Sequence, residues 1–394
     1  MKVPRVLIIA GSDSGGGAGI QADIKTVTML GGHAMTAITA ITAQNTLGVD
    51  AVMPVPTDMV MAQIEAVVRD IGVDVVKIGM IGSAETARAL AERLLGFDRS
   101  VAVIFDPVMV ASSGAALADG RTISAFYRLA DAATVITPNA QELNALTGLP
   151  VRDVEELSAA AKQLAKRHRA FVMAKGGHLA GDELTDILVD LDGVEQQRWT
   201  SPRIDSRNTH GTGCTLASAI AAEWSRPSAT DVKVAVARAF VRSAVLNAPR
   251  FGTGHGPMGH WGAATGLLNI NQVTLPARDY AEAVRFYKDL GLLQIVDSSE
   301  RYARFECPGG ATLSIHVSQD AVVGDAVVYL ETAELDDWVG LLESRKKIVF
   351  DSPPTDENWG WREARVTDPS GNKLCVYWAG ENRRFPPWRI STGK

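Results

Sequence analysis

Short, mainly apolar runs recur through the first two thirds of the chain, and stretches with helical periodicity separate them. A strand that is apolar at every position is buried on both faces, and strands that alternate with helices form a mostly parallel sheet with helices on both sides. The runs fall at residues 6–10, 34–42, 73–78, 101–105, 134–136 and 170–174. We therefore expect an α/β fold, with helices such as 19–30, 84–95 and 154–166 between the strands.

The residue pattern changes after residue 247. Residues 247–266 are rich in glycine and proline, which is typical of a loop. The remainder reads as one strand, one helix and three strands, and this order occurs twice. The pattern predicts two domains, residues 1–265 and residues 266–394, the second being an α+β domain of paired βαβββ modules. A chain of 394 residues has room for two or three domains.

Charge and cysteine content limit the partners and the compartment. The net charge is -6, whereas nucleic-acid-binding proteins are more often basic, so we expect no nucleic-acid partner. Three cysteines, an odd number, argue against a disulfide framework and favour a reducing compartment. The apolar run at residues 6–10 is too short for a signal peptide or a membrane span. We therefore expect a cytoplasmic protein with no membrane partner.

The first glycine-rich segment, residues 11–19, lies between a predicted strand and a predicted helix and contains five glycines. Glycines at such a place let a ligand approach the backbone closely. The segment lacks the Gly-x-x-x-x-Gly-Lys-Ser/Thr pattern of a P-loop. The second predicted strand also lacks the acidic residue that a dinucleotide site needs. A ligand site of another kind, or a tight turn without a ligand, remains.

A second turn, Gly211-Thr212-Gly213-Cys214, precedes another predicted helix. A Gly-x-Gly turn at a helix N-terminus points consecutive backbone N–H groups at one spot, which binds anions and stabilises developing negative charge. Cys214 falls in the first helical turn, where we expect the helix dipole to lower the pKa of its thiol. The alternative is a buried, inert cysteine, which the position on an anion-binding turn disfavours.

With these two turns and six further segments, the first domain resembles the hydroxymethylpyrimidine/phosphomethylpyrimidine kinase family of the ribokinase superfamily. The segments occur in the family's order. They are AGSDSGGGAGIQAD (10–23), TAQNTLG (42–48), KIGM (77–80), DPVM (106–109), TPNAQE (137–142), KGGH (175–178), NTHGTGC (208–214) and GHGP (254–257). The resemblance implies a ribokinase-like fold, usually dimeric. It also implies ATP-dependent phosphorylation of 4-amino-5-hydroxymethyl-2-methylpyrimidine to its monophosphate and then its diphosphate in thiamine biosynthesis.

The resemblance assigns five residues to the pyrimidine. They are Gly11, Asp23, Gln44, Met80 and Val108. Asp23 and Gln44 can hydrogen-bond the edge of an aminopyrimidine, and Met80 offers a soft apolar face.

The resemblance makes Gly211, Thr212, Gly213 and Cys214 the anion hole around the transferred phosphoryl group. Cys214 is then the candidate general base for the hydroxymethyl group. The second phosphorylation uses an acceptor that is already anionic, so a base should matter less for that step.

The resemblance places Asp106, Asn139, Glu142 and Lys175 near Mg-ATP. Hard carboxylate and amide oxygens suit Mg²⁺, which usually keeps several waters and bridges to ATP phosphates. Lys175 would face the nucleotide phosphates as a point charge. Taken singly, Lys175 reads as a solvated surface lysine and Glu142 as an acid at a helix start.

Several alternatives stay open for this domain. Related kinases phosphorylate pyridoxal, whose aldehyde could react with Cys214, although Gln44 and Met80 favour the pyrimidine. A kinase fold kept only as a ligand sensor is disfavoured by the intact 211–214 turn and Lys175. Asp186 and Asp205 lie where they could reach the rim of the site, and neither receives a role.

The second domain, with Asp-Pro-Ser-Gly-Asn at residues 368–372, resembles the vicinal oxygen chelate superfamily, which includes glyoxalase I, extradiol dioxygenases and bleomycin-resistance proteins. Catalytic members bind a divalent metal through His and Glu on inner strands. Here those positions fall on Gln272, Val327 and Cys375, and His316 could face the same cavity. This departure from the family pattern argues against a catalytic metal.

Without a metal, the second domain could be a small-molecule-binding cup or a dimerisation module. A glyoxalase-like second activity is the alternative. Aromatic residues in a concave sheet can stack on a flat ring, although ordinary packing explains any single one equally well. The candidates are Trp338, Trp359, Trp361, Tyr377 and Trp378. The tail at residues 382–388 is expected to be an extended arm.

Overall fold

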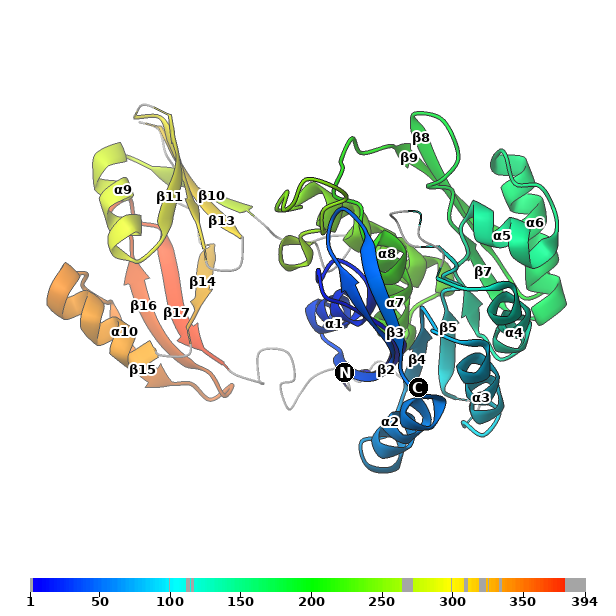
Figure 1. The fold of residues 1–394 in the computed structure, drawn as a ribbon. Coiled ribbons are helices and arrows are strands. Elements are labelled where there is room, and N and C mark those ends of the chain that lie inside the picture. The colour runs from blue at the N-terminus through cyan, green and yellow to red at the C-terminus, as the bar shows by residue number, and fades with distance from the viewer. Residues whose placement is uncertain are drawn as a thin grey trace. The chain divides into compact units, whose positions relative to one another are not determined.

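A computed structural model describes residues 3–379, apart from gaps at 99, 111–113, 115–116, 264–271, 299, 308–310, 319–323, 325 and 333–334. The chain forms two compact units, residues 2–267 and 268–394. Figure 1 shows the elements of both units. The expected arm at residues 382–388 lies outside the described residues.

The first unit contains a nine-stranded sheet of order β3-β2-β1-β4-β5-β6-β7-β8-β9. Its strands are β1 (Arg5–Asp13), β2 (His33–Gln44), β3 (Val49–Pro54), β4 (Val75–Ile78), β5 (Ala102–Phe105), β6 (Val135–Ile136), β7 (Phe171–Ala174), β8 (Glu183–Val189) and β9 (Glu195–Pro202). The six strands β1, β2 and β4–β7 pair in parallel, and β3, β8 and β9 add antiparallel edges. The predicted mostly parallel sheet is confirmed.

Helices cover both faces of this sheet (Figure 1). They are α1 (Gly19–Met29), α2 (Thr57–Asp70), α3 (Ala84–Leu94), α4 (Gly120–Asp131), α5 (Ala140–Thr147), α6 (Val154–His168), α7 (Thr212–Trp224) and α8 (Thr230–Leu246). One apolar core joins the sheet to α2–α6, and a second joins it to α1, α7 and α8. No helix among the described residues is long and apolar enough to cross a membrane.

The strand order determines where the loops of this unit gather. The chain leaves β1 toward β2 on one side, whereas β4 lies against β1 on the other side. In an open α/β sheet, ligands bind at the carboxyl ends of the strands beside such a reversal. The loops after β1, β4, β5, β6 and β7 all leave the sheet at these ends, and each carries one of the segments singled out above.

The second unit repeats the order βαβββ, as predicted. The first module consists of β10 (Gln272–Ala277), α9 (Tyr280–Asp289), β11 (Leu293–Ser298), β12 (Tyr302–Glu306) and β13 (Thr312–Val317). The second consists of β14 (Val327–Glu331), α10 (Leu335–Leu341), β15 (Ser352–Asp356), β16 (Arg362–Thr367) and β17 (Lys373–Trp378). Each module forms a four-stranded sheet, and the two share one apolar core.

From the apolar residues Ile348, Val349 and Phe350, the first strand after the second helix of this unit is predicted near residues 347–350, which is misplaced. Residues 347–350 are not a strand, and β15 begins only at Ser352. Lys347 has a left-handed backbone with φ of 56°, which ends the preceding helical turn. Ile348 and Phe350 are buried in the shared core. These apolar side chains therefore anchor a loop to the core and do not mark a strand.

The Asp-Pro-Ser-Gly-Asn segment is a turn organised by its first residue. Asp368 accepts hydrogen bonds from the backbone N–H groups of Ser370 and Asn372, and from the Tyr287 hydroxyl at 2.8 Å. Gly371 has φ of 98°, which favours glycine. The segment therefore ties the turn before β17 to α9.

Candidate active site

The two glycine-rich turns of the first unit pack directly on each other. Gly211 is the N-cap of α7 with φ of 86°, and a Cβ placed on it would lie 1.9 Å from the carbonyl oxygen of Gly17. A Cβ on Gly17 would lie 2.6 Å from the His210 ring. Only glycines permit this approach, so the turn after β1 and the N-terminus of α7 form one surface.

Asp13, at the end of β1, organises the first turn. Its carboxylate accepts the backbone N–H groups of Gly15, Gly17 and Ala18 and lies 3.0 Å from His210 Nε2. Burial opposes ionisation of Asp13, but the hydrogen bonds from His210 and the backbone hold the pKa of this carboxyl below its ordinary value. Asp13 is therefore a charged anchor for both turns.

The sequence assigned roles to neither Asp13 nor His210, although both lie in segments that it singled out. His210 Nε2 lies 2.9 Å from Gln44 Nε2 at the end of β2. Gln44 is only partly buried. Gln44, which is predicted to hydrogen-bond the pyrimidine edge, is thus held beside His210, next to the 211–214 turn.

Asp23 lies beneath this surface rather than on it. It is fully buried on α1, Lys77 Nζ donates to its Oδ2 at 2.8 Å, and the Ser218 hydroxyl donates to its Oδ1 at 2.7 Å. Burial raises the pKa of Asp23, which Lys77 and Ser218 oppose. Since both oxygens already have partners, Asp23 is placed to position its neighbours rather than to hydrogen-bond a pyrimidine.

Gly11, Met80 and Val108 line the neighbouring strand ends. A Cβ on Gly11 would lie 3.0 Å from Met80 Sδ, so the thioether lies against the backbone of β1. The Thr39 hydroxyl fixes the loop by donating to the Met80 carbonyl at 2.6 Å. Val108 is partly buried and donates its backbone N–H to the Asp106 carbonyl. The end of β1 and the loops after β4 and β5 thus bring these three residues to the same end of the sheet.

Asp106, Lys175 and Gly213 meet at the N-terminus of α7. Lys175 Nζ donates to Asp106 Oδ1 at 2.8 Å, and the Thr137 hydroxyl donates to the same oxygen. A Cβ on Gly213 would lie 3.3 Å from Lys175 Nζ and 3.6 Å from Asp106 Oδ2. Burial lowers the pKa of Lys175, but Asp106 and Glu142 outweigh it and raise that pKa, so the ammonium stays charged. A positive charge therefore lies next to the 211–214 turn.

Asn139 and Glu142 form a capping box at the start of α5. The Asn139 side chain accepts the Glu142 N–H, and Glu142 Oε2 accepts the Asn139 N–H at 2.7 Å. Glu142 is thus the helix-start acid of the alternative reading, and it also lies 3.8 Å from Lys175 Nζ. Burial raises the pKa of Glu142 to about 7, against the effect of Lys175. The capping box therefore keeps one carboxylate oxygen of Glu142 near the Lys175 ammonium.

The expectation for the Cys214 thiol is wrong in sign. Burial raises the pKa of this thiol to about 11, and the carboxylates of Asp23 and Asp106 add to the increase, while Lys77 opposes it. The helix N-terminus is a local effect, whereas burial beside two carboxylates is set by the fold. In the ligand-free chain the thiol is therefore protonated at neutral pH.

Asp186 and Asp205 have different surroundings. Asp186 is buried, accepts the Gly176 N–H at 3.0 Å and pairs with Arg238 at 2.8 Å. It therefore fixes the loop that carries Lys175. Asp205 is exposed, and nothing in its surroundings gives it a role in the site.

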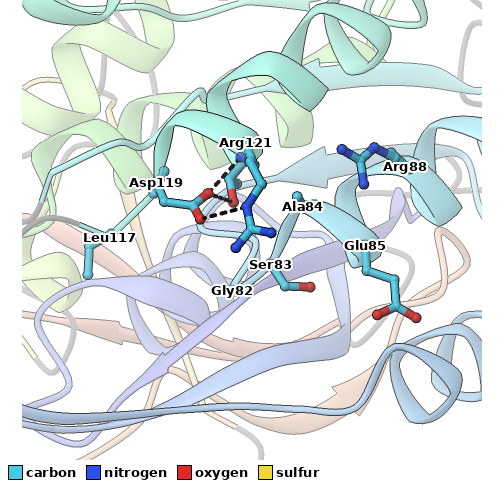
Figure 2. A pocket seen from close by; sticks show the side chains of 10 residues that line it. Gly82, Ser83, Ala84, Glu85, Arg88, Leu117, Asp119 and Arg121 are labelled. Carbon is cyan, nitrogen blue, oxygen red and sulfur yellow. Dashed lines mark hydrogen bonds and ion pairs between the residues drawn. The ribbon is translucent and has the colours of Figure 1, made fainter.

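A hollow in the first unit lies elsewhere, between the N-terminal turns of α3 and α4 (Figure 2). Ser83 and Asp119 cap these helices from its wall, and Asp119 also faces Arg121 at 3.7 Å. None of the predicted site residues lines this hollow. The candidate site is therefore the surface around the 211–214 turn.

In the second unit, the predicted residues are dispersed. Gln272 is exposed and donates to the Ser314 hydroxyl at 3.4 Å, and His316 is exposed on β13. Cys375 is buried on β17, where its thiol donates to Glu363 Oε2 at 3.4 Å. Burial raises the pKa of Cys375 to about 12. No three His, Cys, Asp or Glu side chains of the described residues gather as a metal cage.

Three aromatic residues of the second unit contact one another, and the predicted Trp338, Trp359 and Trp378 have other surroundings. Trp361 and Tyr377 stack with ring centroids 4.8 Å apart, and Tyr329 meets both edge-on. Trp338 instead packs against Gly291 in the shared core. Trp359 donates to Glu363 at 2.8 Å, and Trp378 is half exposed. One aromatic cluster therefore lies on the second sheet, with its rings packed against one another.

Comparison with known proteins decides the family. Residues 13–259 match the family model of phosphomethylpyrimidine kinase. The chain belongs to this family. It is 46% identical over 258 residues to the hydroxymethylpyrimidine/phosphomethylpyrimidine kinase of Streptomyces coelicolor, a match that covers 65% of this chain and 94% of that protein. It is 47% identical over 256 residues to the thiamine biosynthesis bifunctional protein ThiED of Geobacter sulfurreducens, covering 65% of this chain and only 52% of that protein.

Solved structures agree with the ribokinase-like fold. The pyridoxal kinase from Staphylococcus aureus in complex with pyridoxal has a TM-score of 0.60 and 33% identity, over 67% of this chain and 95% of that one. Phosphomethylpyrimidine kinase from Clostridium difficile has a TM-score of 0.54 and 35% identity, over 62% of this chain and 100% of that one. Residues 269–376 match the Glyoxalase/Bleomycin resistance protein/Dioxygenase superfamily, so a second unit of this superfamily follows the kinase unit.

His260 makes the stability of the kinase unit depend on pH. It is buried beneath α7, with Nε2 2.9 Å from the Thr215 hydroxyl, and burial lowers its pKa to about 4 from an ordinary 6.5. Between pH 6.5 and pH 4, His260 is mostly protonated in the unfolded chain and mostly neutral in the folded chain. We therefore expect the unfolding free energy of wild type to fall on acidification from pH 6.5 to pH 4. This fall should exceed that of His260→Gln by ~2–3 kcal/mol. Denaturant unfolding of both proteins across this range measures the difference, and parallel pH curves would contradict it.

Proposed function

We propose that the kinase unit transfers the γ-phosphoryl group of ATP to 4-amino-5-hydroxymethyl-2-methylpyrimidine, and then phosphorylates the monophosphate. The observation that carries this proposal is the convergence at Gly213, whose Cα lies at the N-terminus of α7 beside Lys175 Nζ and Asp106 Oδ2. Backbone N–H groups and an ammonium at one spot suit a transferred phosphoryl group, because they stabilise the charge on its oxygens.

In this proposal each part of the site has a separate task. The backbone N–H groups of the 211–214 turn and the Lys175 ammonium hold the phosphoryl oxygens, and the Asp13–His210 contact keeps the two glycine-rich turns together. Cys214 takes the proton of the substrate hydroxyl as the oxygen attacks phosphorus. Its protonated resting state means that the thiolate must gain stabilisation once substrates are bound.

The donor set fits Mg²⁺ bound together with ATP. Asp106 Oδ2 is buried and has no hydrogen-bond partner among the described residues, and Glu142 presents a second carboxylate across Lys175. Mg²⁺ takes one or two carboxylates and fills its remaining positions with water and phosphate oxygens. Bound Mg²⁺ supplies charge neutralisation of the phosphates. At Asp106 it would also offset one of the carboxylates that raise the pKa of Cys214.

The pyrimidine is favoured over pyridoxal by the curated relatives and by Gln44. An amide presents a donor and an acceptor side by side, which matches the ring nitrogen and amino group of an aminopyrimidine. Met80 against Gly11 provides the apolar contact. Asp23 lies beneath these residues, paired with Lys77 and Ser218, and makes no contact with the pyrimidine in this proposal.

ATP consumption with each acceptor tests the proposal. With Mg²⁺ present, we expect turnover of hydroxymethylpyrimidine to the mono- and diphosphate, and much slower turnover of pyridoxal. Turnover of pyridoxal alone would contradict the pyrimidine assignment and place the enzyme in vitamin B6 metabolism. No turnover of either acceptor would remove the kinase assignment and favour a ligand sensor.

For the second unit we propose a small-molecule-binding or dimerisation role without a catalytic metal, with the domain boundary near residue 265. The hydrogen bond from the Cys375 thiol to Glu363 and the exposed position of Gln272 support the absence of a catalytic metal. We also propose a homodimer in the cytoplasm. Elemental analysis of the purified chain tests the metal prediction, and a stoichiometric transition metal would contradict it.

A further inference from the structure

A buried ion pair lies beneath the first turns of α7, with no step of the proposed reaction assigned to it. Lys77 Nζ donates to Asp23 Oδ2 at 2.8 Å, and the side chains of Lys77, Asp23 and Ser218 are fully buried. Removing two charges from water costs free energy that their attraction often fails to offset, so such a pair is weak support for stability alone. The pair therefore calls for a functional explanation.

The register of α7 places this pair behind Cys214. Ser218 follows Cys214 by four residues, so the two side chains share one face of the helix. The helix packs against α1, which carries Asp23, and against β4, which carries Lys77, and Ser218 hydrogen-bonds Asp23 directly. A Cβ on Gly79 would lie only 2.9 Å from Lys77 Nζ, so the ammonium is closely confined.

Charged groups face Cys214 from four elements. Lys77 comes from β4, Asp23 from α1, Asp106 from the loop after β5 and Lys175 from the loop after β7. Asp106 and Lys175 are paired with each other at 2.8 Å.

A neutral hydrogen-bond donor and a lysine with unused N–H groups also act on the Cys214 sulfur. The backbone N–H of Gly19 donates toward the sulfur. For the Lys77 ammonium, the described residues supply Asp23 as hydrogen-bond acceptor, and two of its three N–H groups are left for another acceptor. Lys77 therefore keeps N–H groups that can respond to a charge on the sulfur while it remains paired with Asp23.

We propose that Lys77 is a positioning residue for Cys214, and that its ammonium balances the negative charge of the thiolate. The proposal rests on the proposed function. The thiol proton leaves to water, and the thiolate then takes the proton of the substrate hydroxyl. At the same time the new O–P bond forms and the bond between the γ-phosphorus and ADP breaks. Asp23 and Ser218 hold Lys77 for this task.

The rate at which iodoacetamide alkylates Cys214 at pH 8 tests the proposal without any kinase assay, because only the thiolate reacts. Mass spectrometry of the Cys214 peptide gives the rate, and Cys307 in the second unit is an internal reference. We expect Asp23→Asn, which removes the carboxylate and keeps Lys77, to react faster than wild type. Adding Lys77→Gln to Asp23→Asn should slow Cys214 by about tenfold or more relative to Asp23→Asn.

Two further variants guard against damage to the fold. Lys77→Met with Asp23→Leu replaces the pair by apolar side chains and must also react about tenfold more slowly than Asp23→Asn. Lys162→Met removes a lysine on α6 that pairs with Glu195, and it should leave the rate unchanged. If the folded double variants react as fast as Asp23→Asn, Lys77 does not act on the sulfur and the proposal fails.

Kinetics separate this proposal from the proposed function. The double variants should lower kcat for the first phosphorylation in proportion to the alkylation rate, with KM for the pyrimidine and the second phosphorylation little changed. If alkylation responds as expected while Cys214→Ala phosphorylates normally, Lys77 still balances the thiolate, and only the base role of Cys214 is lost. If alkylation does not respond, the Lys77 proposal fails whatever the activity.

Discussion

Cys214→Ala is expected to lower kcat for phosphorylation of hydroxymethylpyrimidine by about 100-fold or more, because a positioned general base typically contributes 10²–10⁴-fold. The second phosphorylation should fall far less, since its phosphate acceptor is already anionic. Separating the mono- and diphosphate products over time measures the two steps independently. Unequal effects on the two steps would show that Cys214 moves a proton and does not merely shape the turn.

The raised pKa of Cys214 adds a pH dependence with a definite sign. A base whose pKa is about 11 is mostly protonated at neutral pH, so its active fraction rises tenfold for each pH unit. We expect kcat/KM for the first step to rise with pH between pH 6 and 9 in wild type, and this rise to be absent in Cys214→Ala. Cys307→Ala, in the second unit, is the matched control. Equal profiles for wild type and Cys214→Ala would rule out the base role.

Gly211→Ala should abolish most of the activity and destabilise the kinase unit. The alanine would have to adopt φ of 86°, with its Cβ 1.9 Å from the Gly17 carbonyl oxygen. One of the two turns must therefore move, and the backbone donors lose their alignment. Loss of one such donor typically costs 10²–10³-fold in kcat. We expect a loss of about that size or more, together with ~2–3 kcal/mol of unfolding free energy from backbone strain and displacement.

Gly148→Ala is the matched control for this prediction. Gly148 also has a left-handed backbone, with φ of 74° at the end of α5, but a Cβ on it would meet nothing within 4 Å. It should cost ~1 kcal/mol and leave kcat unchanged. Denaturant unfolding and the ATP assay on both variants measure the difference. Similar losses in the two proteins would mean that strain alone, and not the contact between the turns, explains the effect.

Much of the kinase unit could be predicted from local pattern. The six apolar runs are the six parallel strands, because strands buried on both faces are mostly apolar; Lys77 in β4 is an exception. The antiparallel strands β3, β8 and β9 gave a weaker signal. β3 and β9 lie at the two edges of the sheet and expose most of their residues, and polar residues interrupt the first half of β8.

The partners of the site residues were less predictable. The segments that carry Gly11, Met80, Asp106 and Lys175 follow strands in sequence, and parallel strands end at the same edge of a sheet, so their assembly follows from order alone. Asp23 is different, because its partners Lys77 and Ser218 lie 54 and 195 residues away along the chain. No feature of the neighbouring sequence distinguishes a carboxylate that faces a ligand from one that pairs with a buried ammonium.

By itself, the sequence determined the α/β architecture, the paired βαβββ modules and the turn at the start of α7, since these depend on periodicity and on glycine at fixed positions. Only the tertiary structure decided the charge states. The helix position of Cys214 predicted a lowered pKa, and burial beside Asp23 and Asp106 reversed it. The reason is physical: secondary structure is encoded by neighbours in the chain, whereas the pKa of a side chain depends on solvent exclusion and on charges that folding brings from distant segments.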